Sequence, residues 1–272
     1  TRLLSYWDMQ YPFGSPPAGF TYGKEYSPSE IESGAFTATA LDSVGHGTNV
    51  AGIAVGDGQS GKACRDKWKY PGVAPAADII GVKLRNYSGQ VLTSDLFAAI
   101  KYVFGRADAL HKPAVVNVSL GDQLGPHDGH SQLDSDLMSM CPPGPGHIIV
   151  AAAGNDAVNG RHVRVPLKQA APTATLSIGD YDESATPSDA HYIFFQGWMG
   201  ADDYPNVTVH TPNGYSVALN GSGSYTTPDG NIGFTSYTGI AWPNGEHEYE
   251  VRIYSPSNSQ DPAAGNWDFL FQ

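Results

Sequence analysis

Apolar residues in the first half of the chain gather in three nearly continuous runs of strand length. The runs cover residues 78–84, 114–120 and 147–153. A run with so little polar alternation is typical of a strand buried on both faces, as in a parallel sheet. After Thr93, apolar residues recur at helical spacing, which predicts a helix capped by this threonine. These apolar positions are Leu96, Phe97, Ile100, Val103 and Phe104.

Strands and helices are expected to alternate in this half of the chain. Residues 132–140 predict a second helix, and residues 1–8 have the character of a strand. This order favours an α/β fold with right-handed crossovers in a doubly wound sheet. Residues 9–43 instead hold several prolines and few periodic apolar positions, so we predict a long surface loop. Within it, a short helix is expected near residues 29–34, capped by Ser27 or Ser29.

The hydrophobic pattern changes near residue 160, where short alternating runs replace the helical spacing. Such runs occur at 173–178, 192–195, 206–210 and 248–253. Turns of the Pro-Asn-Gly and Pro-Asp-Gly type separate several of them. Strands at this spacing predict an antiparallel β-sandwich of roughly a hundred residues. The expected domains are therefore residues 1–160, an α/β portion, and residues 161–272, a β-sandwich.

Composition narrows the class of protein. Of 272 residues, 40% are hydrophobic and 15% charged, enough to build a sizeable core. The formal net charge of −12 argues against nucleic acid and anionic membrane surfaces as partners. It suits a soluble and often secreted protein, so we expect a secreted or extracellular location.

Several features restrict the chemistry and the processing of the chain. Cys64 and Cys141 allow either one disulfide or two thiols. No Cys/His cluster has zinc-site spacing, and no apolar run is long enough to span a bilayer. The chain has no signal peptide and no initiator methionine. We expect a processed or excised piece.

The candidate chemistry centres on residues 44–54, where His46 lies between Gly45 and Gly47. Flanking glycines permit a sharp turn and a close approach to the imidazole. Small apolar residues then recur at helical spacing, with Gly52 allowing close packing, which predicts a short buried helix carrying the histidine in its first turn. A lone His-Gly pair would more simply be a satisfied core histidine. The longer motif, however, resembles that of the subtilisin-like serine peptidases, in which this histidine is the general base.

A second motif strengthens the resemblance. Residues 150–156 match the Ala-Ala-Gly-Asn segment of that family, in which the asparagine amide donates to the oxyanion. By this resemblance Asn155 meets the negative charge of the tetrahedral intermediate from the end of a rigid buried strand. In a subtilisin such a donor is worth roughly two to three powers of ten in rate.

The resemblance also implies two edges of a peptide-binding cleft. Gly72-Val73-Ala74-Pro75 and Val82-Lys83-Leu84 are similar to family segments that precede a Ser-Gly stretch, here Ser88, Gly89 and Gln90. Ser119, Leu120 and Gly121 would form the opposite edge. An extended substrate would gain main-chain hydrogen bonds on each side, and Gly89 and Gly121 would permit its approach.

The chain departs from the family where the rest of the catalytic triad is expected. The resemblance covers about residues 40–158, within which Asn49 stands where the family often has a second histidine. The Asp-Thr/Ser-Gly and Gly-Thr-Ser-Met-Ala motifs are absent from the sequence. Asp42 and Asp8 are in no matching context, and we expect both to be solvated loop carboxylates. The chain therefore resembles an internal portion of a peptidase, with a jelly-roll-like insert before the serine segment.

Two functional hypotheses follow. In the first, the chain is part of a serine endopeptidase that acts on peptides or proteins, needs no cofactor, and depends on the missing peptidase segments of its parent polypeptide. Alone it would not hydrolyse peptide bonds by the triad mechanism. In the second, it is a non-catalytic binding or structural module. Asp202 and Asp203 would fit a structural calcium site, although adjacent carboxylates are also common in solvated turns.

Overall fold

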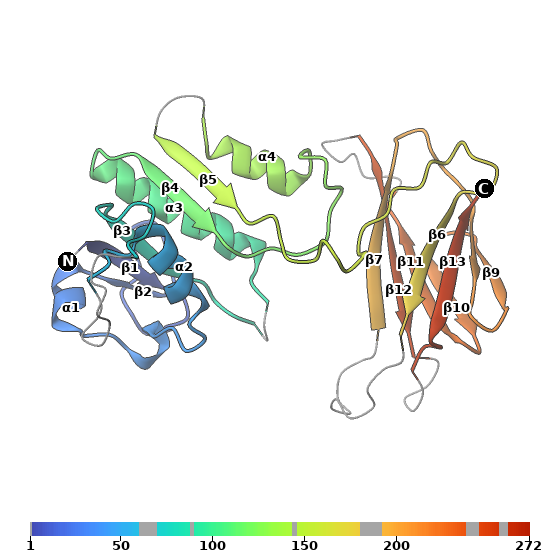
Figure 1. Ribbon diagram of the computed structural model, residues 1–272, viewed down its shortest axis with the longest axis horizontal. Coiled ribbons are helices and arrows are strands. Elements are labelled where there is room, and N and C mark those ends of the chain that lie inside the picture. The colour runs from blue at the N-terminus through green and yellow to red at the C-terminus, as the bar shows by residue number, and fades with distance from the viewer. Residues whose placement is uncertain are drawn as a thin grey trace. The chain divides into compact units, whose positions relative to one another are not determined.

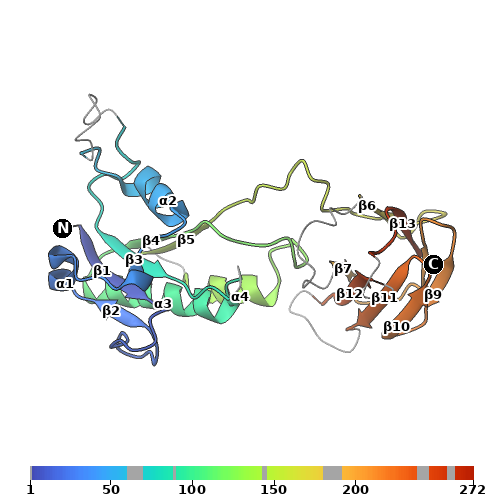
Figure 2. The ribbon, with the colours of Figure 1, turned by 90° about the horizontal axis from the view of Figure 1, so that it is seen from below.

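The computed structural model describes residues 2–59, 70–87, 90–142, 146–179, 192–237, 245–255 and 261–272 (Figures 1 and 2). By internal contacts the chain divides into two compact units. The first unit is Thr1–Leu120 with Asp136–Ala152, and the second is Gly121–Ser135 with Ala153–Gln272. The domain boundary near residue 160 remains a prediction. Of the described helices, none has the length and apolar character needed to cross a membrane.

The first unit contains a mixed three-stranded sheet in the order β2-β1-β3. β1 (Leu3–Asp8) is central, with β3 (Ile79–Lys83) parallel to it and β2 (Lys24–Tyr26) antiparallel. Fully buried Trp7 of β1 packs in a core with Met9, Ala99 and Tyr102. Both β1 and β3 are confirmed as strands, but β3 is not buried on both faces, since all of its residues are only half-buried.

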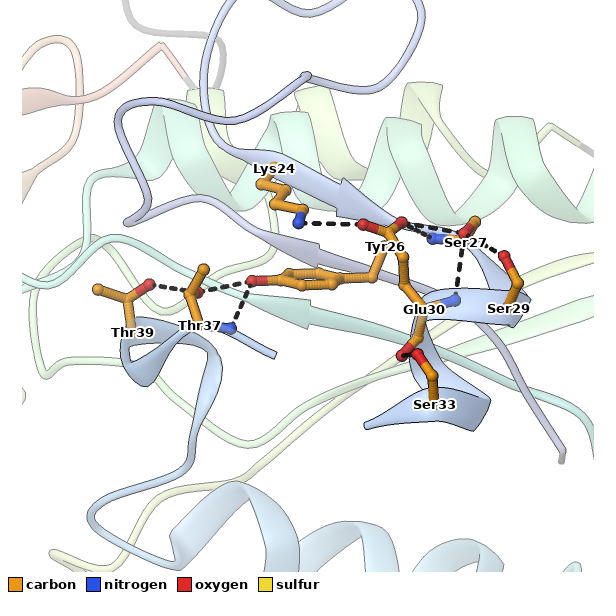
Figure 3. A network of polar contacts seen from close by, with 8 residues as sticks. All are labelled: Lys24, Tyr26, Ser27, Ser29, Glu30, Ser33, Thr37 and Thr39. Carbon is orange, nitrogen blue, oxygen red and sulfur yellow. Dashed lines mark hydrogen bonds and ion pairs between the residues drawn. The ribbon is translucent and has the colours of Figure 1, made fainter. Parts of the chain in front are cut away.

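The prediction of an unstructured loop over residues 9–43 is wrong in part. This segment contains β2, helix α1 (Pro28–Ser33) and the 3-10 helix η1 (Ala38–Ala40). A three-residue strand has no readable period, and β2 is defined by its pairing with β1, which leaves Tyr26 fully buried. The predicted short helix is confirmed with Ser27 as its cap, in a reciprocal capping box with Glu30 (Figure 3).

The predicted central helix is present as α3 (Thr93–Ala109), but its cap differs from the prediction. Leu92 has the extended N-cap geometry, with φ −75° and ψ 138°, and Thr93 is already the first helical residue. The buried face of α3 includes Ile100 and Phe104, as its apolar spacing predicts.

The other parallel strands of the first unit are β4 (Ala114–Val118) and β5 (His147–Ala151), with α4 (Gln132–Ser139) between them in sequence. The prediction that β4 and β5 are buried on both faces is wrong, because Val115 is 65% exposed and Ile148 is 54% exposed. The alternate residues face α3, where the rings of Phe104 and His147 stack 4.0 Å apart. In the described part of the chain, the other face of this pair carries no comparable cover.

The α/β character of the first unit is confirmed, but its strands do not form one continuous sheet. Helix α3 contacts both β3 and β4, yet these strands belong to separate sheets. One edge of β3 and one edge of β4 have no partner strand among the described residues.

The second unit contains two four-stranded antiparallel sheets, ordered β10-β11-β12-β7 and β6-β13-β8-β9. Their strands are β6 (Thr173–Ile178), β7 (Tyr192–Met199), β8 (Val207–His210), β9 (Ser216–Leu219), β10 (Gly223–Thr227), β11 (Gly230–Ser236), β12 (His247–Tyr254) and β13 (Gly265–Phe271). Both sheets contribute to one hydrophobic cluster, which includes Ile253 and Trp267, both fully buried. The rings of Phe195 and Phe269 meet across it, 4.8 Å apart. From residue 161 onward, the described residues contain no helix.

Candidate active site

His46 is the first residue of helix α2 (His46–Val55). Gly45 caps the helix with a φ of 83°, a left-handed conformation that favours glycine. The imidazole is exposed, and it has no hydrogen-bond partner among the residues that the structure describes.

The position of this helix is confirmed, but its predicted burial is wrong. None of its residues is buried, and Ile53 is 65% exposed. A Cβ added at Gly52 would meet nothing within 4 Å, so no close packing requires glycine there. The pattern shows that one face of the helix is apolar, but only the rest of the fold decides whether that face is covered.

Asp42 is an exposed loop carboxylate, as predicted, and it also anchors the start of α2. Its Oδ1 accepts from the Gly45 N–H at 2.8 Å, and its Oδ2 accepts from the N–H and hydroxyl of Thr48 at 2.8 and 2.7 Å. These hydrogen bonds, that of the Thr48 hydroxyl foremost, lower the pKa of Asp42 to about 2. The carboxylate therefore caps the helix three residues ahead of the N-cap position. A signal for this role exists in the sequence, namely an aspartate shortly before a Gly-His-Gly-Thr helix start.

The other end of α2 is held by residues that are distant in sequence. The N–H groups of Gly72, Val73 and Ala74 donate to the carbonyls of Gly56, Ile53 and Ala54 at 2.7, 3.0 and 2.8 Å. The Arg2 guanidinium donates to the Val55 carbonyl at 2.7 Å. These bonds satisfy carbonyls that a helix end leaves without intrahelical partners. Both ends of the helix that carries His46 are thereby fixed within the first unit.

Asp8 differs from its prediction, because it is fully buried. Its carboxylate accepts from the Thr39 hydroxyl at 2.6 Å and from the Gln10 N–H at 2.9 Å. The hydrogen bonds tie the end of β1 to the segment around η1. Asp8 is therefore a structural carboxylate of the first unit.

Asn155 lies four residues beyond β5, which ends at Ala151. The prediction that Asn155 lies at the end of a buried strand is therefore wrong, because β5 is largely exposed and ends at Ala151. Gly154 precedes it with a φ of 85°. The Asn155 side chain is exposed and, like His46, has no hydrogen-bond partner in the described part of the chain. Asn155 belongs to the second unit and His46 to the first.

The structure describes only part of the two segments that are predicted to line the substrate. Ser88 and Gly89 lie outside the described residues, while Tyr87 and Gln90 exchange backbone hydrogen bonds of 2.8 and 3.1 Å. On the other edge, Ser119 accepts from the Asn117 amide at 2.9 Å and Leu120 is 39% exposed. A Cβ added at Gly121 would meet nothing within 4 Å.

The structure describes Asp202, Asp203 and Cys141, which were candidates for a calcium site and a disulfide. Asp202 and Asp203 are exposed, and Asp203 donates its N–H to the Gly200 carbonyl in a tight turn. Within the ranges that the structure describes, no group of three or more His, Cys, Asp or Glu residues is placed to hold a metal ion. Cys64 lies outside those ranges, and so does its pairing with Cys141.

Curated proteins similar to this chain are peptidases by name. A subtilisin of Bacillus sp. (strain TA39) is 36% identical over 117 residues, which are 43% of this chain and 25% of that protein. Subtilisin-like protease 5 of Arthroderma otae is 27% identical over 188 residues, 66% of this chain and 40% of its own length. The minor extracellular protease Epr of Bacillus subtilis is 28% identical over 187 residues, 67% of this chain and 26% of that protein. The chain thus spans well under half the length of these relatives.

Comparison with solved structures and with family models extends over more of the chain. The structure of the Clostridium perfringens CspB protease matches with a TM-score of 0.77 and 22% identity, covering 100% of this chain and 54% of that one. At this identity the match shows a shared fold. The family model described as the subtilase family matches residues 21–266, well beyond the 40–158 in which the motifs are recognisable. Since that match includes most of both units, the chain belongs to the subtilase family.

Proposed function

We propose that this chain is the histidine- and asparagine-bearing portion of a subtilisin-class serine endopeptidase that hydrolyses peptide bonds in proteins. The observation that carries the proposal is the state of His46. Its helix is fixed at both ends, and its imidazole is exposed and without a partner among the described residues. A structural histidine in a glycine-rich turn would instead be satisfied by its neighbours.

In this proposal His46 is the general base. It takes the proton from a serine hydroxyl as that oxygen attacks the scissile carbonyl, and it returns the proton to the leaving amine. The serine and the aspartate that orients the imidazole come from segments of the parent polypeptide outside these 272 residues. Asp42 does not take the aspartate's role, because its carboxylate is engaged by Gly45 and Thr48.

Asn155 is proposed as the oxyanion donor. Its amide N–H would meet the negative charge that develops on the former carbonyl oxygen, and an amide without a partner among the described residues needs no rearrangement to do so. Substrate would lie between residues 88–90 and 119–121 in extended form.

The remaining parts of the molecule are assigned on the same basis. One edge of β3 and one edge of β4, which have no partner strand within the described ranges, would accept a strand from the missing peptidase segments, because an open strand edge carries unsatisfied backbone groups. The two sheets around one core in the second unit support a β-sandwich insert ahead of the serine segment. A secreted or extracellular location agrees with the acidic composition and with a relative named as an extracellular protease.

The test is a peptide-hydrolysis assay on the 272-residue chain beside a longer polypeptide that adds the flanking sequence at both ends. We expect activity only in the longer polypeptide. His46→Ala should abolish it, whereas Asn155→Ala should reduce kcat by about 10²–10³. Asn49→Ala, an exposed change in the same helix, is the matched control and should leave kcat unchanged.

Two outcomes would contradict the proposal. Activity in the short chain that a serine-directed phosphonate abolishes would reveal a nucleophile within these residues. A longer polypeptide that carries the serine motif but has no activity would favour the non-catalytic binding module.

A further inference from the structure

A side-chain hydrogen bond joins Gln123 to the loop that carries Asn155. The Gln123 Nε2 donates to Oδ2 of Asp156, the residue directly after Asn155, at 2.9 Å. The same amide lies beside the residue directly before Asn155, since a Cβ added at Gly154 would be 3.6 Å from its Nε2. Gln123 thus lies against both sequence neighbours of Asn155, and all four residues belong to the second unit.

Asp156 also has partners within its own loop. Its Oδ1 accepts from the Asn159 side-chain amide at 2.6 Å and lies 3.4 Å from Nε of Arg161. Its carbonyl accepts from the Asn159 N–H at 2.9 Å. These contacts shape the loop, but they do not attach it to another part of the unit. The hydrogen bond from Gln123 spans 33 residues of sequence and makes such an attachment.

The segment around Gln123 is itself held in place. Nε2 of His127 donates to the Gln123 carbonyl at 3.1 Å, and this nitrogen carries the proton because a carbonyl only accepts. The Gly125 N–H donates to Oε1 of Gln196 in β7 at 2.8 Å. Gln196 in turn donates from its Nε2 to Oε1 of Glu248 in β12 at 2.5 Å, and Glu248 is buried. Gln123 therefore lies in a segment that is attached to one sheet of the second unit.

Asn155 depends on its neighbours for its orientation. Its side chain is exposed and has no hydrogen-bond partner in the described ranges. The preceding Gly154 has a φ of 85°, and a glycine restricts the backbone less than any other residue. The direction of the Asn155 amide is thus set by the backbone around it, which Gln123 holds through Asp156.

We propose that Gln123 is a positioning residue for Asn155, because its hydrogen bond to Asp156 fixes the backbone that directs the Asn155 amide. This inference rests on the proposed function, in which that amide donates to the oxyanion. Such a donor stabilises the transition state most when it is already in place and needs no rearrangement. A small misplacement of the donor lowers the rate even though the donor itself is unchanged. Gln123 acts through Asp156 and does not contact the reacting atoms.

The experiment measures steady-state kinetics of Gln123→Ala in the longer polypeptide of the preceding assay. We expect kcat to fall about tenfold, less than for Asn155→Ala, with KM unchanged, because an oxyanion donor acts in the transition state. Gln123→Lys keeps a donor for the Asp156 carboxylate and should retain most of kcat. Gln169→Ala, at an exposed glutamine of the same unit, is the matched control and should change neither constant.

A double-mutant comparison separates positioning from general damage. In an Asn155→Ala background, Gln123→Ala should cause no further loss, because the group that Gln123 positions is gone. Equal losses in the two backgrounds would overturn the positioning role. So would an unchanged kcat in Gln123→Ala, or a loss that is confined to KM.

A second measurement is independent of activity. In the same polypeptide with labelled asparagine, nitrogen-15 relaxation should give a lower order parameter for the Asn155 N–H in Gln123→Ala, and Gln169→Ala should leave it in place. An unchanged order parameter and chemical shift would overturn the inference. If the wild-type polypeptide hydrolyses no peptide while the order parameter still falls, the proposed function fails but Gln123 still orders the Asn155 loop. The two failures are therefore distinguishable.

Discussion

At the scale of single residues, Asp42 decides how the helix of His46 begins. Its carboxylate accepts three hydrogen bonds from Gly45 and Thr48 and so takes up donors at the helix start. Because Asp42 lies only four residues before His46, the sequence alone would suggest that its carboxylate pairs with the imidazole. The geometry instead gives the carboxylate a capping role at the start of the helix.

The pKa of Asp42 tests this role. We expect a carboxyl NMR titration to give a value of about 2, against an ordinary 3.8. Thr48→Val removes the hydroxyl donor and should raise the pKa toward 3.8, with part of the shift remaining because the N–H groups persist. Thr39→Val, a change at a residue bonded to Asp8 instead, is the control and should leave the pKa of Asp42 in place.

The sign of the accompanying pH effect follows from the lowered pKa. The stabilising contribution of Asp42 is fully present above pH 3.8 and is lost as the pH falls through about 2. The protection factor of the Thr48 amide, its exchange rate corrected for the intrinsic rate at each pH, should therefore fall over that range. A titration midpoint near 3.8 in the wild type would contradict the capping role.

At the scale of elements, two glycines make opposite demands on helix α2. A Cβ at Gly72 would lie 2.5 Å from the Gly56 nitrogen and 2.8 Å from the Val55 nitrogen, so the backbone would have to move. A Cβ at Gly52, inside the helix, would meet nothing within 4 Å. Both positions are glycine, so the sequence alone does not show which of them has room for a Cβ atom.

The corresponding alanine variants should shift stability in opposite directions. Gly72→Ala should lower the free energy of unfolding by about 1–3 kcal/mol, because it overpacks the contact that closes the helix. Gly52→Ala should raise it by about 0.5–1 kcal/mol, because alanine loses less backbone entropy in a helix. Urea unfolding followed by circular dichroism measures both. Equal effects would show that the end of α2 is not held by residues 72–74.

At the scale of the whole molecule, each compact unit has its own core, and Asp229 links the two sheets of the second one. It lies between β10 and β11 of one sheet and is 4% exposed. Its carboxylate accepts from the Thr211 hydroxyl and from the N–H and amide of Asn213, in the β8–β9 turn of the other sheet. Burial alone would raise the pKa of Asp229, but these hydrogen bonds outweigh it and lower the pKa.

Asp229→Asn should therefore destabilise the second unit by about 1–3 kcal/mol, since it weakens buried hydrogen bonds to a charged group. Hydrogen exchange should accelerate most in the two turns around residues 211–215 and 227–230. The contribution is present above the unfolded pKa of an aspartate and is lost as the pH falls through the lower folded value. Asp202→Asn, at an exposed position, should stay within about 0.5 kcal/mol. Unchanged exchange in both turns would contradict the link between the sheets.

The sequence by itself determined the features that depend on local pattern. Apolar runs located β3, β4 and β5, helical spacing located α3, and alternation located β6, β7, β8 and β12. It did not indicate β9, β10 or β11. The glycines around His46 marked the start of α2, and the motifs around His46 and Asn155 indicated the subtilase family. Each of these signals is carried by residues close together in the chain, where backbone preference and side-chain period act directly.

Tertiary structure decided everything that depends on which segments meet. It made β2 a strand through its pairing with β1, buried Asp8 against Thr39, and drew Asp42 into the cap of α2. It also left Val115 and Ile148 exposed, although their runs predict burial on both faces. The hydrophobic pattern shows which side chains favour burial. The residues that bury them, and those that form hydrogen bonds with them, are often distant in sequence.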